Sequence, residues 1–325
     1  MASMAENSRI EWTHHTFNPW IGCAKISPAC DHCYAEGWAK RAGREQLWNG
    51  HGIRSRTSAA NWKQPVKWNA TAERLGVRYR VFCASLADVF DNQAPDEWRR
   101  DLAALIIATP HLDWLLLTKR IGNADKMLAA MFPDGIPDNV WVGATITSQT
   151  EADRDIPKLL ALPVAVRFLS MEPLLGHVDL RFHIFSEPTG NFRTNAGKRQ
   201  MELRKPSDGG LHWVIVGGES GSAESRSIHP AWVRALRDQC RAGGVAFHFK
   251  QWGDWRPPEE GEEYDTSMGR AQRVPAFIVA TTGTVHCFEN ESTKDGGAVM
   301  LRVGKAKSGR TLDGMLHDGY PEIPQ

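Results

Sequence analysis

The sequence predicts an α/β protein built as a partial (β/α) TIM-like barrel. Short apolar runs recur along the chain, segments with helical spacing lie between them, and no G-x-G-x-x-G motif follows the first run, as a dinucleotide-binding fold would require. The runs are rich in Val, Ile, Leu or aromatic residues and do not alternate cleanly, which is typical of strands covered on both faces. The expected strands are 17–22, 81–85, 114–118, 140–146, 164–170, 213–217 and 245–250.

Amphipathic segments between these runs predict helices. Apolar residues recur at helical spacing at Trp98, Leu102 and Leu105, and Gly243-Gly244 is a typical helix stop. Helices are expected over 97–108, 124–132, 151–162 and 232–243, with another beginning near Asp31. Because strands and helices alternate, the sheet or barrel should be parallel.

Two domains are expected. Residues 1–253 would form the partial barrel, interrupted by a polar, basic insertion at 183–210. Residues 254–325 would form a C-terminal extension with an acidic, glutamate-rich loop. The extension then continues into an appended β-hairpin at 276–289, whose turn is expected at Thr282-Gly283.

The composition is that of an ordinary globular protein. The 325 residues are 42% hydrophobic and 24% charged, with a mean hydropathy of −0.41, which excludes fibrous and wholly disordered proteins. No apolar stretch approaches the roughly 18 to 20 residues that a bilayer requires, so no membrane partner is expected. The first residues lack a cationic-then-apolar signal pattern, and we therefore expect a cytoplasmic protein with reduced thiols.

Charge is balanced overall but not locally. The net charge of +1 predicts no polyanionic partner by itself. Residues 40–80 nevertheless hold ten Lys or Arg and two Glu, a net of +8, with Trp48, Trp62, Trp68 and Tyr79 among them. Cations interleaved with aromatic residues suit phosphate contact and base stacking, whereas a solvated face with tryptophan anchors has the same composition. The segment alone leaves both interpretations open.

Three of the six cysteines, Cys23, Cys30 and Cys33, fall within eleven residues. In a reducing compartment such a cluster indicates a metal site or catalysis before it indicates disulfides. Three thiolates would hold a [4Fe–4S] cluster and leave one iron open to a substrate or cofactor. The remaining cysteines are expected to be core residues or inert thiols: Cys83, Cys240 and Cys287.

Zinc is the alternative occupant of this segment. A Cys3His site could recruit His14, His15 or His32, and a closed tetrahedral zinc would only staple the loop. Against zinc, the spacing between Cys23 and Cys30 is longer than in zinc knuckles, and no fourth ligand lies at a recognisable spacing. The ligand types favour iron–sulfur over zinc and leave zinc as the second interpretation.

Polar residues gather where the expected strands end, and in a parallel barrel these ends meet at one mouth. They are Ser85, Asp88, Lys119, Arg120, Thr145, Glu172, Glu219, Lys250 and Gln251. Buried charges there would need partners, which carboxylates facing Lys or Arg would supply. The alternative is a network of salt bridges that merely closes the end of the barrel.

Individual roles follow from side-chain chemistry. Asp88 and Glu219 are expected to accept hydrogen bonds from a cofactor amine or ribose. Gly217 and Gly218 would allow a ligand to approach the backbone closely. The cations expected to bind anionic substrate groups are Lys119, Arg120 and Arg310.

Several segments together resemble a known family. They are Phe17-Asn-Pro-Trp-Ile-Gly-Cys23, Cys30-x-x-Cys33-Tyr34-Ala35, Ser85-Leu-Ala-Asp88-Val-Phe90, Leu117-Thr-Lys119-Arg120, Ser170-Met-Glu172-Pro-Leu-Leu, Val216-Gly-Gly-Glu219-Ser-Gly221, Lys250-Gln-Trp-Gly253 and the glycine-rich run 304–314. Over most of its length the chain resembles the phage-associated three-cysteine-motif family, a group related to radical S-adenosylmethionine (SAM) enzymes.

The resemblance implies a partial barrel of the radical SAM type, in which Cys23, Cys30 and Cys33 hold a [4Fe–4S] cluster. S-adenosylmethionine would bind the open iron, and its reductive cleavage would give a 5′-deoxyadenosyl radical that abstracts hydrogen from a substrate. The expected cofactor-binding residues are Tyr34, Ser85, Asp88, Thr145, Gly217, Gly218 and Glu219. The expected catalytic residues are Lys119, Arg120, Glu172 and Lys250.

The leading hypothesis is a radical SAM enzyme that modifies or repairs a nucleic-acid base or nucleotide, with DNA, RNA or a nucleotide as its partner. The substrate class rests on the basic segment 40–80 and the basic insertion. The alternative is a zinc- or cluster-stapled nucleic-acid-binding module without radical chemistry. A third hypothesis is an accessory subunit that acts with a partner protein, consistent with the acidic loop at 259–263 and the appended hairpin.

Overall fold

The chain divides into two compact units, and each is described by itself. Unit 1 comprises Met1–Thr145 and Lys158–Ser170, and unit 2 comprises Ile146–Pro157 and Met171–Gln325. The computed structural model describes residues 8, 10–48, 53–186, 202–203, 210–263, 276–286 and 296–322. The expected domain boundary between residues 253 and 254 stays a prediction.

The main sheet has seven strands in the order β1-β4-β5-β6-β7-β10-β11. Within unit 1 the neighbouring strands from β1 to β7 are parallel, and within unit 2 β10 is parallel to β11. The bounds are β1 (His15–Thr16), β4 (Tyr79–Cys83), β5 (Leu112–Thr118), β6 (Val140–Thr145), β7 (Val166–Met171), β10 (Trp213–Gly217) and β11 (Ala246–Gln251). This parallel α/β sheet with intervening helices confirms the predicted fold class.

The core of unit 1 lies along strands β5 and β6, whose side chains are almost all buried. Trp114 is paired in register with Val140, and its indole Nε1 donates to Thr109 Oγ1 at 3.0 Å. Its ring also meets the edge of Phe17 at 5.6 Å. Each large apolar side chain buried in this way stabilises the fold by about 1.5–3 kcal/mol.

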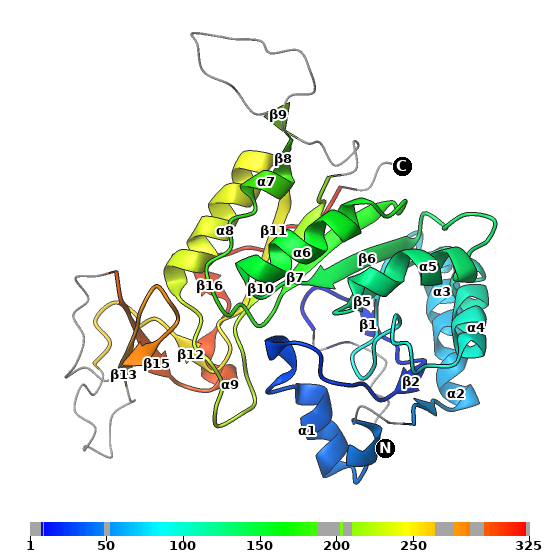
Figure 1. Ribbon diagram of the computed structural model, residues 1–325, viewed down its shortest axis with the longest axis horizontal. Coiled ribbons are helices and arrows are strands. Elements are labelled where there is room, and N and C mark those ends of the chain that lie inside the picture. Colours follow the sequence, from blue (N-terminus) through cyan, green and yellow to red (C-terminus); the bar gives the residue numbers. More distant parts are fainter. Residues whose placement is uncertain are drawn as a thin grey trace. The chain divides into compact units, whose positions relative to one another are not determined.

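The remaining elements of unit 1 surround these strands. They are α1 (Tyr34–Arg41), α2 (Ala59–Trp62), α3 (Gln64–Leu75), α4 (Asp96–Ile107), α5 (Ile121–Met131), the antiparallel pair β2 (Trp20–Ile21) and β3 (Ser55–Arg56), and the 3-10 helices η1 (Pro28–Cys30) and η2 (Glu45–Leu47). Helix α3 packs against β4 and β5, and α4 lies beside α5 (Figure 1). Helices α4 and α5 were predicted within a few residues, whereas α3 was not predicted.

The first strand lies earlier than predicted. Strand β1 pairs with β4, and the amide of Phe17 makes the last backbone hydrogen bond between them. The ladder stops there because Pro19 has no N–H and the side chain of Asn18 itself accepts from the amide of Leu86 at 2.7 Å. The predicted strand 17–22 is therefore wrong in position, and part of it forms β2 instead.

Unit 2 places one long helix against strand β11. Helix α8 (Pro230–Gly243) packs against β11 (Figure 1). It begins at His229, whose Nδ1 accepts from the amide of Ala231 at 3.1 Å, and ends at Gly244, which has a φ of 65° that favours glycine. The other helices of this region are α6 (Gln149–Leu160), α7 (Arg181–Ile184) and α9 (Lys305–Ser308).

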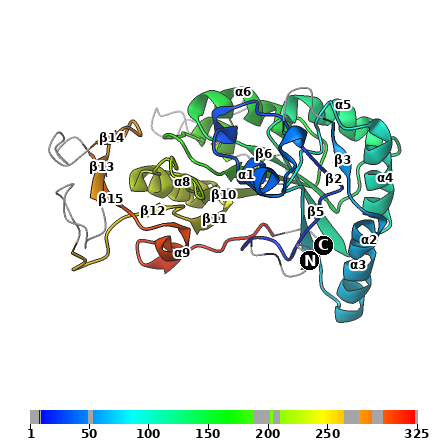
Figure 2. The same ribbon diagram turned by 90° about the horizontal axis from the view of Figure 1, so that it is seen from below.

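The appended hairpin belongs to a four-stranded antiparallel sheet in the order β12-β15-β13-β14 (Figure 2). Strands β13 (Ala276–Val279) and β14 (Val285–His286) form the predicted hairpin, while β15 (Ala298–Arg302) pairs with both β13 and β12 (Trp255–Arg256). The chain continues into the antiparallel pair β16 (Thr311–Leu312) and β17 (Met315–Leu316).

Part of the predicted basic insertion lies outside the described residues, as does Cys287. Its described ends form β8 (Phe185–Ser186) and β9 (Glu202–Leu203), which pair antiparallel. Among the helices of the described segments, none combines the length and apolar character needed to cross a membrane.

Candidate functional site

The cysteine loop, residues 22–33, is fixed at its start by Gly22. This glycine has a φ of 120°, and a Cβ atom here would lie 2.8 Å from the carbonyl oxygen of Leu47. The Gly22 amide donates to Leu86 O at 3.0 Å, and the Cys23 amide donates to Leu47 O at 3.1 Å. The first cysteine is therefore held against the segment that follows β4.

The other two cysteines lie at the ends of short helical turns. Cys30 is buried at the end of η1, and its amide donates to Ser27 O at 2.9 Å. Cys33 caps the start of α1, which also ties down the loop because Lys25 pairs with Glu36 at 2.8 Å. Sequence reasoning expected a helix beginning near Asp31, whereas α1 begins three residues later, at Tyr34.

Cys23 and Cys33 pack against the same small apolar cluster. Both are half-buried, and the cluster consists of Ala35, Ala39, Leu47, Trp48 and Leu86. All three thiols of the loop are free. Cys23 and Cys33 therefore contact one apolar cluster of unit 1. Cys30, which lies between them in the sequence, is buried.

Arg120 links the cysteine loop to the ends of strands β4 and β5. Its Nη1 lies 3.4 Å from Cys23 Sγ and 3.3 Å from Asp88 Oδ2, and its Nη2 donates to Ala24 O at 2.9 Å. Burial raises the pKa of the Cys23 thiol, and the Arg120 guanidinium opposes that rise. The cation that was expected to bind substrate thus contacts the cysteine loop itself.

Asp88 is the hub of this network and is 5% exposed. Its carboxylate accepts from Thr118 Oγ1 at 2.7 Å, from the Lys119 amide at 3.1 Å and from the Phe90 amide at 3.0 Å, besides Arg120. The carboxylate oxygens are therefore already well supplied with donors. Asp88 therefore orients Arg120 and the strand ends, and its expected role of accepting from a cofactor stays a prediction.

Tyr34 and Ser85 join the start of α1 to the segment after β4. The Tyr34 hydroxyl donates to Ser85 O at 2.8 Å, and the Ser85 hydroxyl exchanges hydrogen bonds with the Asn18 side chain. Asn18 lies in the Phe17–Cys23 motif, and its side chain fixes this segment, a role that the sequence did not predict. Arg54 and Asp91 form a second unpredicted contact, a buried ion pair at 2.7 Å.

Two other expected residues of unit 1, Thr145 and Lys119, have side-chain polar groups without a partner among the described residues. Thr145 ends β6 and is 6% exposed, and among the described residues its hydroxyl has no hydrogen-bond partner. Lys119 is half-buried, and its ammonium makes no ion pair with any described residue. A buried hydroxyl without a partner costs free energy, so Thr145 is suited to contact a bound group.

In unit 2, Glu172 and Lys250 form the carboxylate–lysine pair expected at strand ends. Lys250 Nζ lies 2.6 and 2.8 Å from the two carboxylate oxygens, and Gln251 Nε2 donates to Glu172 Oε1 at 3.3 Å. The buried Gln251 Oε1 has no partner in the part of unit 2 that the structure describes. This pair is more open than the Asp88 network, because Glu172 is 21% exposed.

The other expected groups of unit 2 are engaged by their own surroundings. Glu219 is 6% exposed and binds Arg226, which donates to it from its amide and its guanidinium; Arg226 was not among the cations expected at the strand ends. A Cβ atom on Gly218 would lie 2.0 Å from Trp252 O, so the backbone itself requires glycine there. At Gly217 a Cβ atom would lie 3.2 Å from the Glu172 carboxyl carbon.

Arg310 is likewise committed within unit 2. Its Nε donates to Lys250 O at 3.1 Å, and its guanidinium pairs with Asp318. Arg310 therefore holds the end of β11, and its expected anion-binding role stays a prediction.

The donor set of the cysteine loop fits an iron–sulfur cluster in chemistry. Free thiols from one short loop are the ligands that such clusters take. Two of the three histidines considered for zinc are used elsewhere: His14 Nδ1 accepts from the Arg80 amide at 2.8 Å, and His15 stacks on Trp68 at 4.3 Å. In the described ranges, no group of three or more His, Cys, Asp or Glu side chains is arranged to hold a metal ion.

The chain belongs to the family described as "Protein of unknown function (DUF5131)", whose family model matches residues 7–321. No match was found among curated proteins. The phage association and the three-cysteine-motif family stay predictions.

Two solved structures of spore photoproduct lyase are similar to this chain. One is a mutant with dinucleoside spore photoproduct, at 12% identity, and the other is a mutant with bound AdoMet and dinucleoside spore photoproduct, at 13% identity. Each comparison covers 83% of this chain and 69% of that chain, with a TM-score of 0.41. At such low identity, the chemistry of this chain has to be argued from its own residues.

Proposed function

We propose that this protein is a radical SAM enzyme that modifies or repairs a nucleic-acid base or nucleotide. The observation that carries the proposal is the contact between Arg120 and Cys23, because it links the three-thiol loop to the ends of parallel strands in unit 1. Ligand sites of parallel α/β folds lie at such strand ends. The proposal therefore combines a donor set of suitable chemistry with a suitable place in the fold.

Cys23, Cys30 and Cys33 would hold the [4Fe–4S] cluster, with S-adenosylmethionine as its co-substrate. When bound, a cluster reduced by an external one-electron donor would pass that electron to S-adenosylmethionine, whose C5′–S bond would break to give methionine and a 5′-deoxyadenosyl radical. Arg120 positions the Cys23 end of the loop, and Asp88 holds Arg120. These two residues act on the cluster side as positioning residues.

Thr145 and Lys119 are the unit 1 groups best suited to contact the co-substrate. The Thr145 hydroxyl lacks a partner among the described residues, and a bound carboxylate or ribose would supply one. The half-buried Lys119 ammonium, which has no ion pair in the described segments, would neutralise a carboxylate. In unit 2, Lys250 and Glu172 would act on substrate through their more open ion pair.

A nucleic-acid partner is supported by one face of α3. Lys63, Lys67 and Arg74 follow at intervals of four and seven residues, so they lie on one side of the helix. All three are exposed, and none forms an ion pair with a described residue. The tryptophans of the basic segment do not provide a stacking surface, because Trp48 and Trp68 are buried and the Trp62 ring is covered by the Arg56 guanidinium at 4.2 Å. The contact we propose is with phosphate groups and not with bases.

Metal content tests the cluster. Protein purified and reconstituted without oxygen should hold about four iron atoms per chain with a thiolate-to-iron absorption band. Cys23→Ala, Cys30→Ala and Cys33→Ala should each lose most of the iron. Cys240→Ala is the matched control, since Cys240 is fully buried in α8 and should leave iron unchanged. Stoichiometric zinc, or undiminished iron in Cys30→Ala, would contradict the proposal, and zinc would favour a nucleic-acid-binding module.

Salt dependence tests the α3 face. The affinity for a fluorescein-labelled DNA duplex should fall with salt, and the triple variant Lys63→Ala, Lys67→Ala, Arg74→Ala should flatten the log–log slope by about 2–3. Arg241→Ala removes an exposed cation of α8 and serves as the control. An unchanged slope in the triple variant would remove α3 as the contact surface, whatever the metal content.

A further inference from the structure

A cavity between α4 and α5 of unit 1 is not used by the proposed chemistry. It has a volume of about 510 Å³, which is in the range of small-molecule sites. Its walls come from the first turn of α4 and from one face of α5, where the small residues Gly122 and Ala130 leave the space open. The cavity therefore has the size of a ligand site and lies on the helical layer of unit 1.

The lining of this cavity carries a net positive charge. Arg99, Arg100 and Lys126 stand against a single acid, Asp96, which gives a net of +2. Arg99 is already engaged by Asp96 at 2.5 Å and by the carbonyl oxygen of Asp91 at 2.8 Å. Arg100 and Lys126 form no ion pair with the described residues, and both add to the lowering of the Asp96 pKa that Arg99 causes first. Two cations thus face the cavity without an acidic partner of their own.

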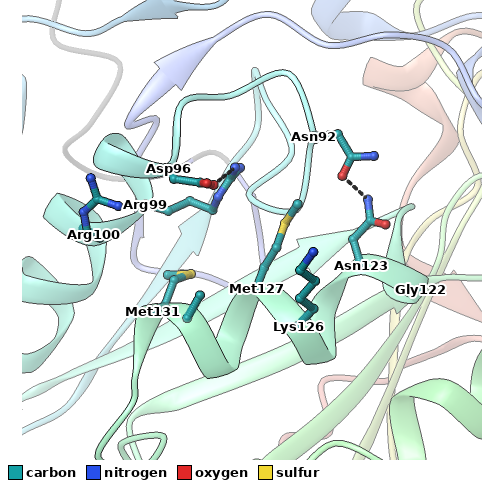
Figure 3. Close-up of a pocket in the computed structure, with 10 residues that line it drawn as sticks. Asn92, Asp96, Arg99, Arg100, Gly122, Asn123, Lys126, Met127 and Met131 are labelled. Atoms are coloured by element: carbon teal, nitrogen blue, oxygen red, sulfur yellow. Dashed lines mark hydrogen bonds and ion pairs between the residues drawn. The ribbon is translucent and has the colours of Figure 1, made fainter.

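The other lining groups favour a planar, polar ring. Met127 and Met131 supply thioether surface, which contacts aromatic rings favourably. Asn123 Nδ2 donates to Asn92 Oδ1 at 3.0 Å, so Asn92 Nδ2 and Asn123 Oδ1 remain as a donor and an acceptor without partners among the described residues. Figure 3 shows this amide pair at one end of the cavity and Arg100 at the other, with Met127 and Lys126 between them.

We infer that this cavity is a binding site for a nucleoside monophosphate. A phosphate monoester carries a charge of about −1.5 to −2 at neutral pH, which matches the net charge of the lining. Arg100 binds the phosphate at one end of the cavity, the methionines contact the base, and the Asn92–Asn123 pair, with Lys126 beside it, binds the polar edge of the base at the other end. The inference is independent of the cysteine loop, because it uses none of the residues assigned to the cluster or to S-adenosylmethionine.

Calorimetry with adenosine 5′-monophosphate tests the site on the full chain. Ala130→Trp fills the cavity and should weaken binding about tenfold or more, and Lys126→Gln, which removes a charged contact to the bound nucleotide, should do the same. Ala129→Trp is the matched control, because Ala129 is the exposed neighbour on α5 that does not line the cavity, and it should bind like the unaltered protein.

Further titrations separate this site from the proposed co-substrate site. Inorganic phosphate and adenosine should each bind more weakly than the whole nucleotide, and excess S-adenosylmethionine should leave the nucleotide isotherm unchanged. The inference is overturned by absent binding, by full affinity in both Ala130→Trp and Lys126→Gln, or by displacement with S-adenosylmethionine. None of these results depends on iron content, so the cluster proposal stands or falls separately.

Discussion

Two carboxylate–cation pairs at strand ends differ in how deeply they are built into their units. In unit 1, Asp88 and Arg120 are 3.3 Å apart, and Asp88 also receives donors from a hydroxyl and two amides. In unit 2, Glu172 and Lys250 are closer, at 2.6 Å, but Gln251 is the only further described group that donates to Glu172. The shorter ion pair is therefore the less embedded one.

This difference shows that the distance between two charged groups is a poor measure of how much the pair contributes to the stability of the fold. A carboxylate saturated by buried donors fixes its neighbours, because removing it leaves several polar groups unsatisfied at once. A single, more exposed ion pair contributes less to stability and remains available to a ligand. We therefore interpret the Asp88 network as scaffolding for the cysteine loop, and the Glu172 pair as a contact that can be exchanged.

Neutralising each carboxylate in turn should have the largest effect on the free energy of unfolding. Asp88→Asn removes the nearer of the two buried acids that face Arg120, the other being Asp91 at 4.0 Å, and leaves the donors to Asp88 poorly satisfied, so it should lower the free energy of unfolding by about 3–5 kcal/mol. Glu172→Gln should cost about 1–2 kcal/mol, because its pair is partly exposed. Urea unfolding of both variants gives the two values. Equal losses, or a larger loss for Glu172→Gln, would contradict the distinction.

A methyl group at Gly218 tests how closely the backbone of unit 2 is packed at this strand end. Gly218→Ala places a Cβ atom against the backbone oxygen of Trp252, so the backbone must shift, and we expect a loss of about 1–3 kcal/mol. Gly176→Ala meets nothing within 4 Å and is the control. Urea unfolding measures both variants. If Gly218→Ala is as stable as Gly176→Ala, close packing of this strand end is disproved.

Acid should weaken unit 1 through His14. Burial, aided by Arg80 and His15, lowers the pKa of His14 from 6.5 to about 4. Between these pH values, His14 therefore binds a proton in the unfolded chain but not in the folded chain. Stability is complete above the higher value and is lost as pH falls through the window. After allowance for screening, the loss should be about 1–2 kcal/mol.

Urea titrations at neutral and mildly acidic pH measure this effect. His14→Gln should flatten the pH dependence, because its side chain does not titrate. His229, which caps α8 in unit 2, also has a pKa lowered chiefly by burial, so His229→Asn provides the corresponding test there. An unchanged pH dependence in His14→Gln would show that His14 does not carry the effect.

Local patterns predicted much of the fold. Strand β10 was predicted at its observed bounds, and β4 to β7 and β11 within a few residues, because buried parallel strands are continuous apolar runs. Helix α3 was missed because its residues were interpreted by charge and aromatic content. Three of its side chains, Pro65, Trp68 and Ala72, are buried and form the inward face of the helix.

The candidate site was only partly predictable. The cysteine loop is local, so its spacing identified it, whereas the contact of Arg120 with Cys23 joins residues 97 positions apart and has no signature in a single sequence. Arg226, the partner of Glu219, lies only seven positions from it, but which cation a carboxylate takes depends on the loop path. Side-chain types and the Glu172–Lys250 pair could be predicted, but the partners of Arg120 and Glu219 could not.

The most direct test of the account is electron spin resonance of the reconstituted, reduced protein with and without S-adenosylmethionine. We expect the spectrum of a reduced [4Fe–4S] cluster whose signal changes when S-adenosylmethionine is added, because the three thiols of the loop leave one iron accessible. A protein that forms no such cluster, or whose cluster spectrum is identical with and without S-adenosylmethionine, would contradict the central claim.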